Sequence, residues 1–124
     1  MARRALAELA VLTALSVGQP SWAGEKVSVT GEVIDSFCYI TMGAKGESHR
    51  ECTQKCADAG IPLALLEDGS NKVIWLFANE DMKTPSAMLR PHAGRKVVIE
   101  GEYAERGGTK ILLVDSVKAA SPKS

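Results

Sequence analysis

The chain has 124 residues, of which 45% are hydrophobic and 5% aromatic, and its 15 Lys and Arg are matched by 15 Asp and Glu. These values are typical of one small soluble globular domain. A neutral chain lacks the clustered positive charge that binding to phosphate backbones requires, so we expect no nucleic-acid partner. The three cysteines need an explanation, because an odd number cannot all pair within one chain.

Residues 1–23 are predicted to be a secretory signal peptide. A positive start at 1–4 precedes an apolar stretch at 5–17, and the small residues that a signal peptidase reads end at Ala23. Because crossing a membrane takes roughly 20 apolar residues, we expect no stable membrane span in the mature form. Cleavage leaves a single domain, 24–124, in the periplasm or outside the cell. There, thiols tend to be paired, metal-bound or catalytic.

Five segments of the mature chain are predicted to be β-strands, because apolar residues alternate in them or fill them between turn signals. A short helix is predicted between the third and fourth strands, where Thr84 and Pro85 provide the N-cap and first turn and Pro91 ends it. The predicted strands are 26–35, 61–67, 72–78, 96–103 and 109–117.

The first and fourth predicted strands share a pattern of Lys, Val, any residue, apolar, any residue, Gly, Glu and apolar. Gly31 and Gly101 interrupt these strands, and a glycine inside a strand typically marks a bend. Bent strands fit a small closed or partly closed barrel, in which closure removes exposed edges. The strand order and the bends resemble the OB-fold, in particular small exported bacterial OB-fold domains. The resemblance covers most of the mature chain and implies a mainly β, five-stranded barrel with two short helices.

All three cysteines lie in residues 36–60, an insertion between the first and second predicted strands. Ser48, followed three residues later by Glu51, has the pattern of a capping box, which predicts a helix that begins at His49. Gly60 provides the C-terminal stop, which gives a helix of about eleven residues. The insertion is therefore expected to place a second short helix beside the barrel.

Four side chains of this insertion form a predicted metal site. His49, Cys52 and Cys56 are spaced by three and four residues, so they share one face of the predicted helix. Cys38 follows the first strand, and a glycine-containing connection allows the chain to return Cys38 over that face. One imidazole and three thiols are the ligands of a tetrahedral zinc site or of a copper(I) site. We expect these residues to hold copper or zinc, for metal handling or delivery.

Two other interpretations use the same cysteines. In a periplasmic thiol-disulfide or electron-transfer accessory module, His49 acts as a base toward Cys52, which exchanges with a client protein. In an interaction barrel with one structural disulfide, Cys38 pairs with Cys52 or Cys56 and attaches the helix to the barrel. The sequence contains no recognisable motif of hydrolytic or transfer catalysis, so a binding protein is favoured over an enzyme.

Overall fold

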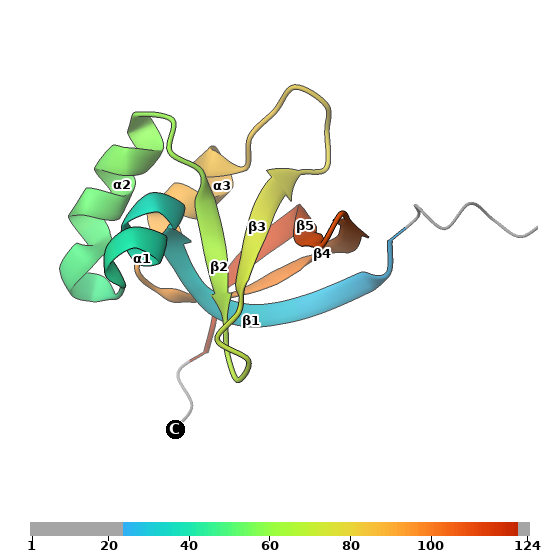
Figure 1. The fold of residues 1–124 in the computed structure, drawn as a ribbon, viewed down its shortest axis with the longest axis horizontal. Helices are drawn as coiled ribbons and strands as arrows, with labels where there is room; N and C mark the ends of the chain where they lie inside the picture. The colour runs from blue at the N-terminus through green and yellow to red at the C-terminus, as the bar shows by residue number, and fades with distance from the viewer. Residues whose placement is uncertain (1–23, 122–124) are drawn as a thin grey trace, which may run out of the picture.

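The computed structural model describes residues 24–121, so the predicted signal peptide lies outside the described residues. Five strands close into a barrel in the order β1-β2-β3-β5-β4 (Figure 1). The strands are β1 (Lys26–Asp35), β2 (Leu63–Glu67), β3 (Val73–Ala78), β4 (Lys96–Arg106) and β5 (Thr109–Ala119). The helices are α1 (Ser36–Met42), α2 (Arg50–Asp58) and α3 (Ser86–Leu89), with 3-10 turns η1 (Glu47–His49) and η2 (Arg90–His92). Within 24–121 no helix is both long and apolar enough to span a membrane.

The barrel confirms the predicted fold class of a mainly β, five-stranded protein with a helical insertion between the first two strands. Neighbouring strands are antiparallel except β3 and β5, which run parallel. Alternate side chains point into the barrel, where Val33, Leu65, Ile99 and Leu112 are fully buried. Burial of these apolar side chains provides the main driving force for folding, so the barrel forms a rigid base for the insertion.

Both predicted glycine bends are present. Gly31 pairs with Glu67 of β2 and with Val97 of β4, so β1 bends between its two neighbours at this point. The β4–β5 pairing shifts register next to Gly101. A Cβ atom at either glycine would overlap a backbone carbonyl oxygen of the neighbouring strand. Glycine is therefore required at both positions by the close approach of two backbones.

Residues 24–121 contain three α-helices, whereas the sequence predicts two short helices. The additional helix, α1, follows β1 directly, in a segment that was predicted to be a connection. The Asp35 carboxylate caps it by accepting hydrogen bonds from the amides of Phe37 at 2.8 Å and Cys38 at 3.2 Å. Gly43, at φ +69°, ends it in the left-handed conformation. Cys38 therefore lies in the first turn of a helix and not in a loop.

The predicted capping box of the second helix is wrong. His49 occupies the N-cap of α2 and makes no side-chain capping hydrogen bond, while Glu51 pairs with Lys55 one turn later. The His49 amide donates to the Gly46 carbonyl at 3.0 Å, so the preceding 3-10 turn already uses this amide. The α-helix consequently begins at Arg50 and is shorter than predicted.

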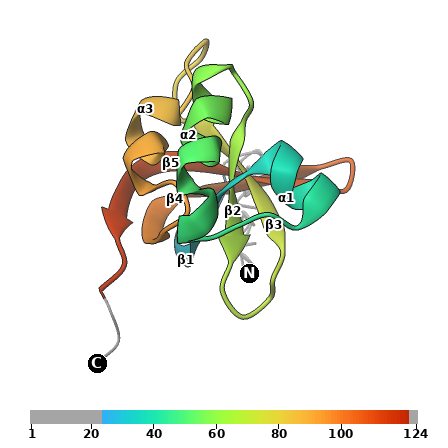
Figure 2. The same ribbon diagram turned by 90° about the vertical axis from the view of Figure 1, so that its left-hand side faces the viewer.

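The third helix also begins later than predicted. Pro85, not Thr84, occupies its N-cap, and the chain continues through the 3-10 turn that contains Pro91. This turn returns the chain to β4, beside the start of α2. Figure 2 shows α2 in front of the barrel with α3 and α1 on either side of it.

Candidate metal centre

Three cysteine sulfurs from α1 and α2 meet near the end of β1. The Sγ atoms of Cys38, Cys52 and Cys56 all lie within 4.8 Å of one another, and all three thiols are free. Cys38 is buried, Cys56 is half-buried and Cys52 is exposed. The sulfur group therefore extends from the interior to the surface, with Cys52 on its solvent side.

The local sequence explains why these sulfurs converge. The cap on α1 places Cys38 in the first helical turn, where it is 6% exposed. In α2, Thr53 and Ala57 are one turn apart and buried, so they define the face that packs inward. Cys52 directly precedes Thr53, and Cys56 directly precedes Ala57. The two cysteines consequently lie along the edge of the buried face, with their sulfurs close to the sulfur of Cys38 on α1.

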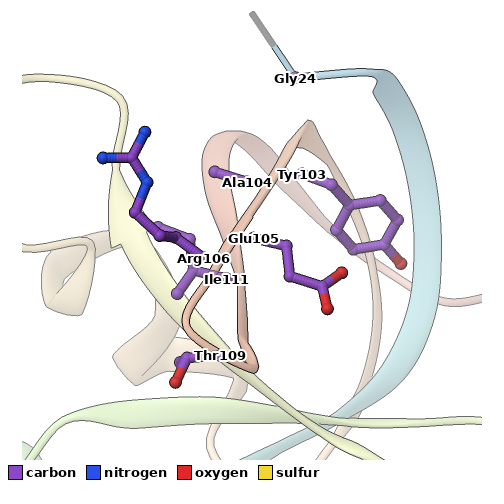
Figure 3. Close-up of a pocket in the computed structure, with 7 residues that line it drawn as sticks. All are labelled: Gly24, Tyr103, Ala104, Glu105, Arg106, Thr109 and Ile111. Atoms are coloured by element: carbon purple, nitrogen blue, oxygen red, sulfur yellow. The ribbon is translucent and has the colours of Figure 1, made fainter. Parts of the chain in front are cut away.

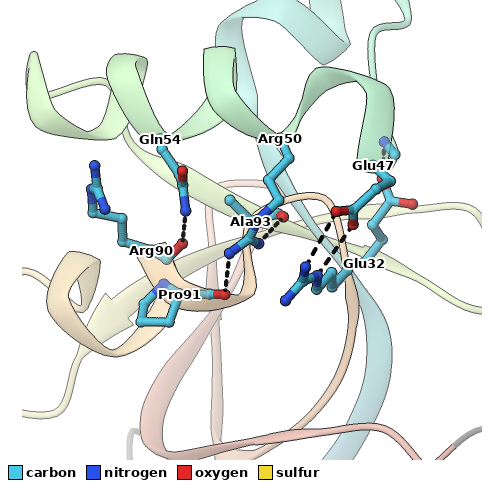
Figure 4. Close-up of polar contacts among 9 residues, drawn as sticks. Glu32, Glu47, Arg50, Gln54, Arg90, Pro91 and Ala93 are labelled. Carbon is cyan, nitrogen blue, oxygen red and sulfur yellow. Dashed lines mark hydrogen bonds and ion pairs between the residues drawn. The ribbon is translucent and has the colours of Figure 1, made fainter.

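Polar contacts hold α2 against the segment between α3 and β4 (Figure 4). The Arg50 guanidinium donates to the carbonyl oxygens of Ala93 at 2.7 Å and Pro91 at 2.9 Å. Gln54 donates to the carbonyl oxygen of Arg90 at 3.2 Å. Two ion pairs flank these contacts, Arg90 with Asp58 and Arg95 with Glu47. The helix that carries two of the three sulfurs is thus fixed to the barrel without relying on a disulfide.

A second group of potential ligand atoms includes Cys38 as well. One ligand atom each from Asp35, Cys38 and His49 lie within 4.8 Å of one another. Asp35 is 0% exposed, and only its Oδ1 atom is used for capping. Among the described residues, Asp35 Oδ2 and His49 Nε2 are the two buried side-chain polar atoms that make no hydrogen bond.

The thiols and the carboxylate influence one another. Burial disfavours the charged carboxylate, but the neighbouring thiols of Cys56 and Cys38, together with backbone amides, outweigh burial and lower the pKa of Asp35. The Asp35 carboxylate beside the thiol, followed by burial, raises the pKa of Cys56 to about 12. Burial and then Asp35 raise the pKa of Cys38. Without a cation, these two thiols are therefore protonated at neutral pH, and a metal ion must displace their protons.

The structure places the other three predicted ligand residues, His49, Cys52 and Cys56, near Cys38. The three cysteines form one group, while His49 shares its group with Cys38 and Asp35. The sequence analysis does not predict Asp35 as a ligand, because Asp35 is the last residue of β1 and also the N-cap of α1, and only the first of these roles was expected. An aspartate at the start of a helix is a common N-cap, but the residues that follow it favour strands, which obscured this signal.

A separate hollow lies at the start of β1, beside the β4–β5 hairpin (Figure 3). It is open, about 700 Å³ in volume, and lined by Tyr103, Glu105 and Arg106 among others. Its lining contains neither a thiol nor an imidazole, so the hollow does not belong to the candidate metal centre.

Comparison of the chain with family models, curated proteins and solved structures gave no match.

Proposed function

We propose that this protein binds a thiophilic metal ion through Cys38, Cys52 and Cys56. The observation that carries the proposal is the mutual approach of three free Sγ atoms to within 4.8 Å. Around one ion at metal–sulfur bonds of about 2.3 Å, tetrahedral geometry places sulfurs about 3.8 Å apart. The three sulfurs therefore need to approach one another by about 1 Å at most to reach this geometry.

The donor set favours copper(I) over zinc at the three sulfurs. Soft thiolates select copper(I), whereas a zinc ion in a structural site takes four ligands. His49 was the predicted fourth ligand, but it is grouped with Cys38 and Asp35 and not with the two cysteines of α2. A zinc ion bound to the three sulfurs therefore needs a water molecule or a shifted imidazole as its fourth ligand.

The exposure of Cys52 supports metal handling or delivery over a purely structural role. A structural zinc site is closed, whereas here one of the three sulfurs lies on the surface. An incoming ligand can reach the ion through Cys52 while the buried sulfur of Cys38 still holds it. Export through the predicted signal peptide, residues 1–23, belongs to the same proposal and would place this exchange in the periplasm or outside the cell.

Intact mass under native and denaturing conditions tests the proposal. We expect native protein to retain copper or zinc and denatured protein to have three free thiols. Cys52→Ser and Cys56→Ser should each weaken copper(I) binding by more than about 100-fold, since even partners that only orient ligands contribute about 10- to 100-fold. Met88→Leu, which removes an exposed sulfur outside the site, is the matched control. A protein without metal and with two protons missing would overturn the proposal in favour of a disulfide.

A thiol-disulfide exchange module is the second candidate. Its supporting observation is that the exposed thiol of Cys52 lies within 4.8 Å of two further free thiols, either of which could resolve a mixed disulfide. If exchange is the function, the double variant Cys38→Ser/Cys56→Ser, which leaves only Cys52, should accumulate a mixed disulfide with a periplasmic client, detectable on non-reducing gels. Unchanged monomer after exposure to an oxidised dithiol would count against this candidate.

A further inference from the structure

Two buried polar atoms without a hydrogen-bond partner belong to residues that share a group of potential ligand atoms with Cys38. These are Oδ2 of Asp35 and Nε2 of His49. A buried polar atom that makes no hydrogen bond destabilises the folded state, so two of them in neighbouring residues need a common explanation. Both residues also provide a ligand atom to the group that includes the Cys38 sulfur. A cation between them would satisfy both atoms at once.

We propose that Asp35, Cys38 and His49 form a second metal position, which takes a divalent ion such as Zn²⁺. One carboxylate oxygen, one thiolate and one imidazole nitrogen are all established zinc ligands, and three protein ligands leave a fourth place for water. This inference rests on the proposed function, because the Cys38 sulfur belongs to both positions and would bridge the two ions.

Charge balance favours a second ion. Once metal binding displaces the thiol protons, three thiolates and the Asp35 carboxylate would carry four negative charges, of which copper(I) at the three sulfurs would compensate one. A divalent ion beside Asp35 reduces the remaining charge from three to one. The carboxylate is 0% exposed and Cys38 is 6% exposed, so uncompensated charge there is costly.

The backbone prepares both outer ligands of this second position. Asp35 is held by the two amides that its Oδ1 atom caps, which leaves Oδ2 available. His49 is held by the hydrogen bond from its amide to the Gly46 carbonyl, at 3.0 Å. Gly46 in turn donates its amide to the Glu32 carboxylate on β1, at 2.9 Å. Both ligand residues are therefore positioned by contacts that a bound ion does not need to create.

Zinc stoichiometry by native mass spectrometry tests this inference on the purified protein, with Zn²⁺ alone as the probe. We expect wild type to bind two equivalents, and Asp35→Asn and His49→Ala to bind one each. The Asn side chain retains a carbonyl oxygen that can cap α1, so the Asp35→Asn variant should keep its fold. Urea unfolding of the metal-free variant checks this expectation. His92→Ala, a change at the second histidine of the chain, is the matched control and should bind two.

The outcomes separate this inference from the proposed function. Failure of wild type to bind either zinc or copper(I) would overturn both. One equivalent of zinc in wild type, retained in Asp35→Asn and His49→Ala, would leave the three-sulfur position standing and overturn the second position. One equivalent of zinc that Asp35→Asn abolishes, together with loss of copper(I) binding in the same variant, would indicate a single mixed site and would also overturn it. Cys38→Ser should lose both equivalents, because its sulfur is shared.

Discussion

Arg50 provides the principal polar attachment of α2, so its removal should loosen the helix that carries Cys52 and Cys56. Its guanidinium donates one part-buried hydrogen bond to Ala93, at 2.7 Å, and one exposed hydrogen bond to Pro91, at 2.9 Å. Hydrogen bonds to charged groups contribute about 1.5–3 kcal/mol when buried and less when exposed. For Arg50→Met, which keeps much of the aliphatic length, we expect a loss of about 2 kcal/mol.

Urea unfolding of the metal-free protein measures this loss. With a slope of about 1–3 kcal/mol per molar urea, a loss of about 2 kcal/mol should lower the midpoint by about 0.7 to 2 M without a change of slope. The matched control is Lys55→Met on the same helix, whose partner Glu51 is exposed and whose ion pair should add little. An Arg50→Met midpoint equal to that of Lys55→Met would refute the idea that these two hydrogen bonds fix α2.

The same variant should affect the metal centre. Two of the three sulfurs move with α2, whereas Cys38 stays with α1 and β1. If α2 is less firmly attached to the barrel in the metal-free variant, ion binding must bring the helix back to its native position. Part of the binding free energy is then used for this ordering. We expect weaker copper(I) binding in Arg50→Met than in Lys55→Met, measured by competition with a chelator. Equal affinities would show that the sulfurs converge without this attachment.

Three further predictions concern the barrel, the surface and the ion. Gly31→Ala should lower the free energy of unfolding by about 1–3 kcal/mol in urea, because its Cβ would overlap the Leu66 carbonyl oxygen. The hydrogen bonds from Arg90 lower the pKa of Asp58 in the folded protein. The stabilisation they give is therefore fully present above the pKa of Asp58 in the unfolded chain, and it is lost as the pH falls through the lower pKa of Asp58 in the folded protein. Asp58→Asn should thus be less stable than wild type at pH 7, and the two should converge in strong acid. Free metal at 100 times its Kd should raise the free energy of unfolding by about 2.7 kcal/mol, and a chelator should reverse this in thermal melts.

The barrel could be predicted because its signals are local. Alternating valines located β1 at its actual bounds, Lys26–Asp35, and glycine within a strand marked both bends. The helix α1 could not be predicted in the same way. Its residues Phe37, Tyr39, Ile40 and Thr41 favour strands, and the cap at one end and Gly43 at the other decide the conformation.

Within the helix the candidate site followed from residue spacing alone, whereas the return of Cys38 to that face was predicted only from a connection that allows it. A spacing of four residues is enough to place Cys52 and Cys56 on one face. The meeting of this face with Cys38 depends on where α1 directs its first turn and on the attachment of α2, which are tertiary features. The Ser48–Glu51 pattern misled for the same reason, because contacts of the preceding turn outweighed a local capping preference.

Asp35 connects the fold to the chemistry of the site. As an N-cap, asparagine or serine would serve α1 about as well, and neither would bury a negative charge. A carboxylate with 0% exposure is costly unless something compensates it, and capping uses only one of its two oxygens. The cap explains one oxygen at this position, and the neighbouring thiols together with the backbone amides keep the carboxylate ionised. A cation held between Asp35, Cys38 and His49 would be attracted to this buried charge, and it would also give the His49 imidazole a partner.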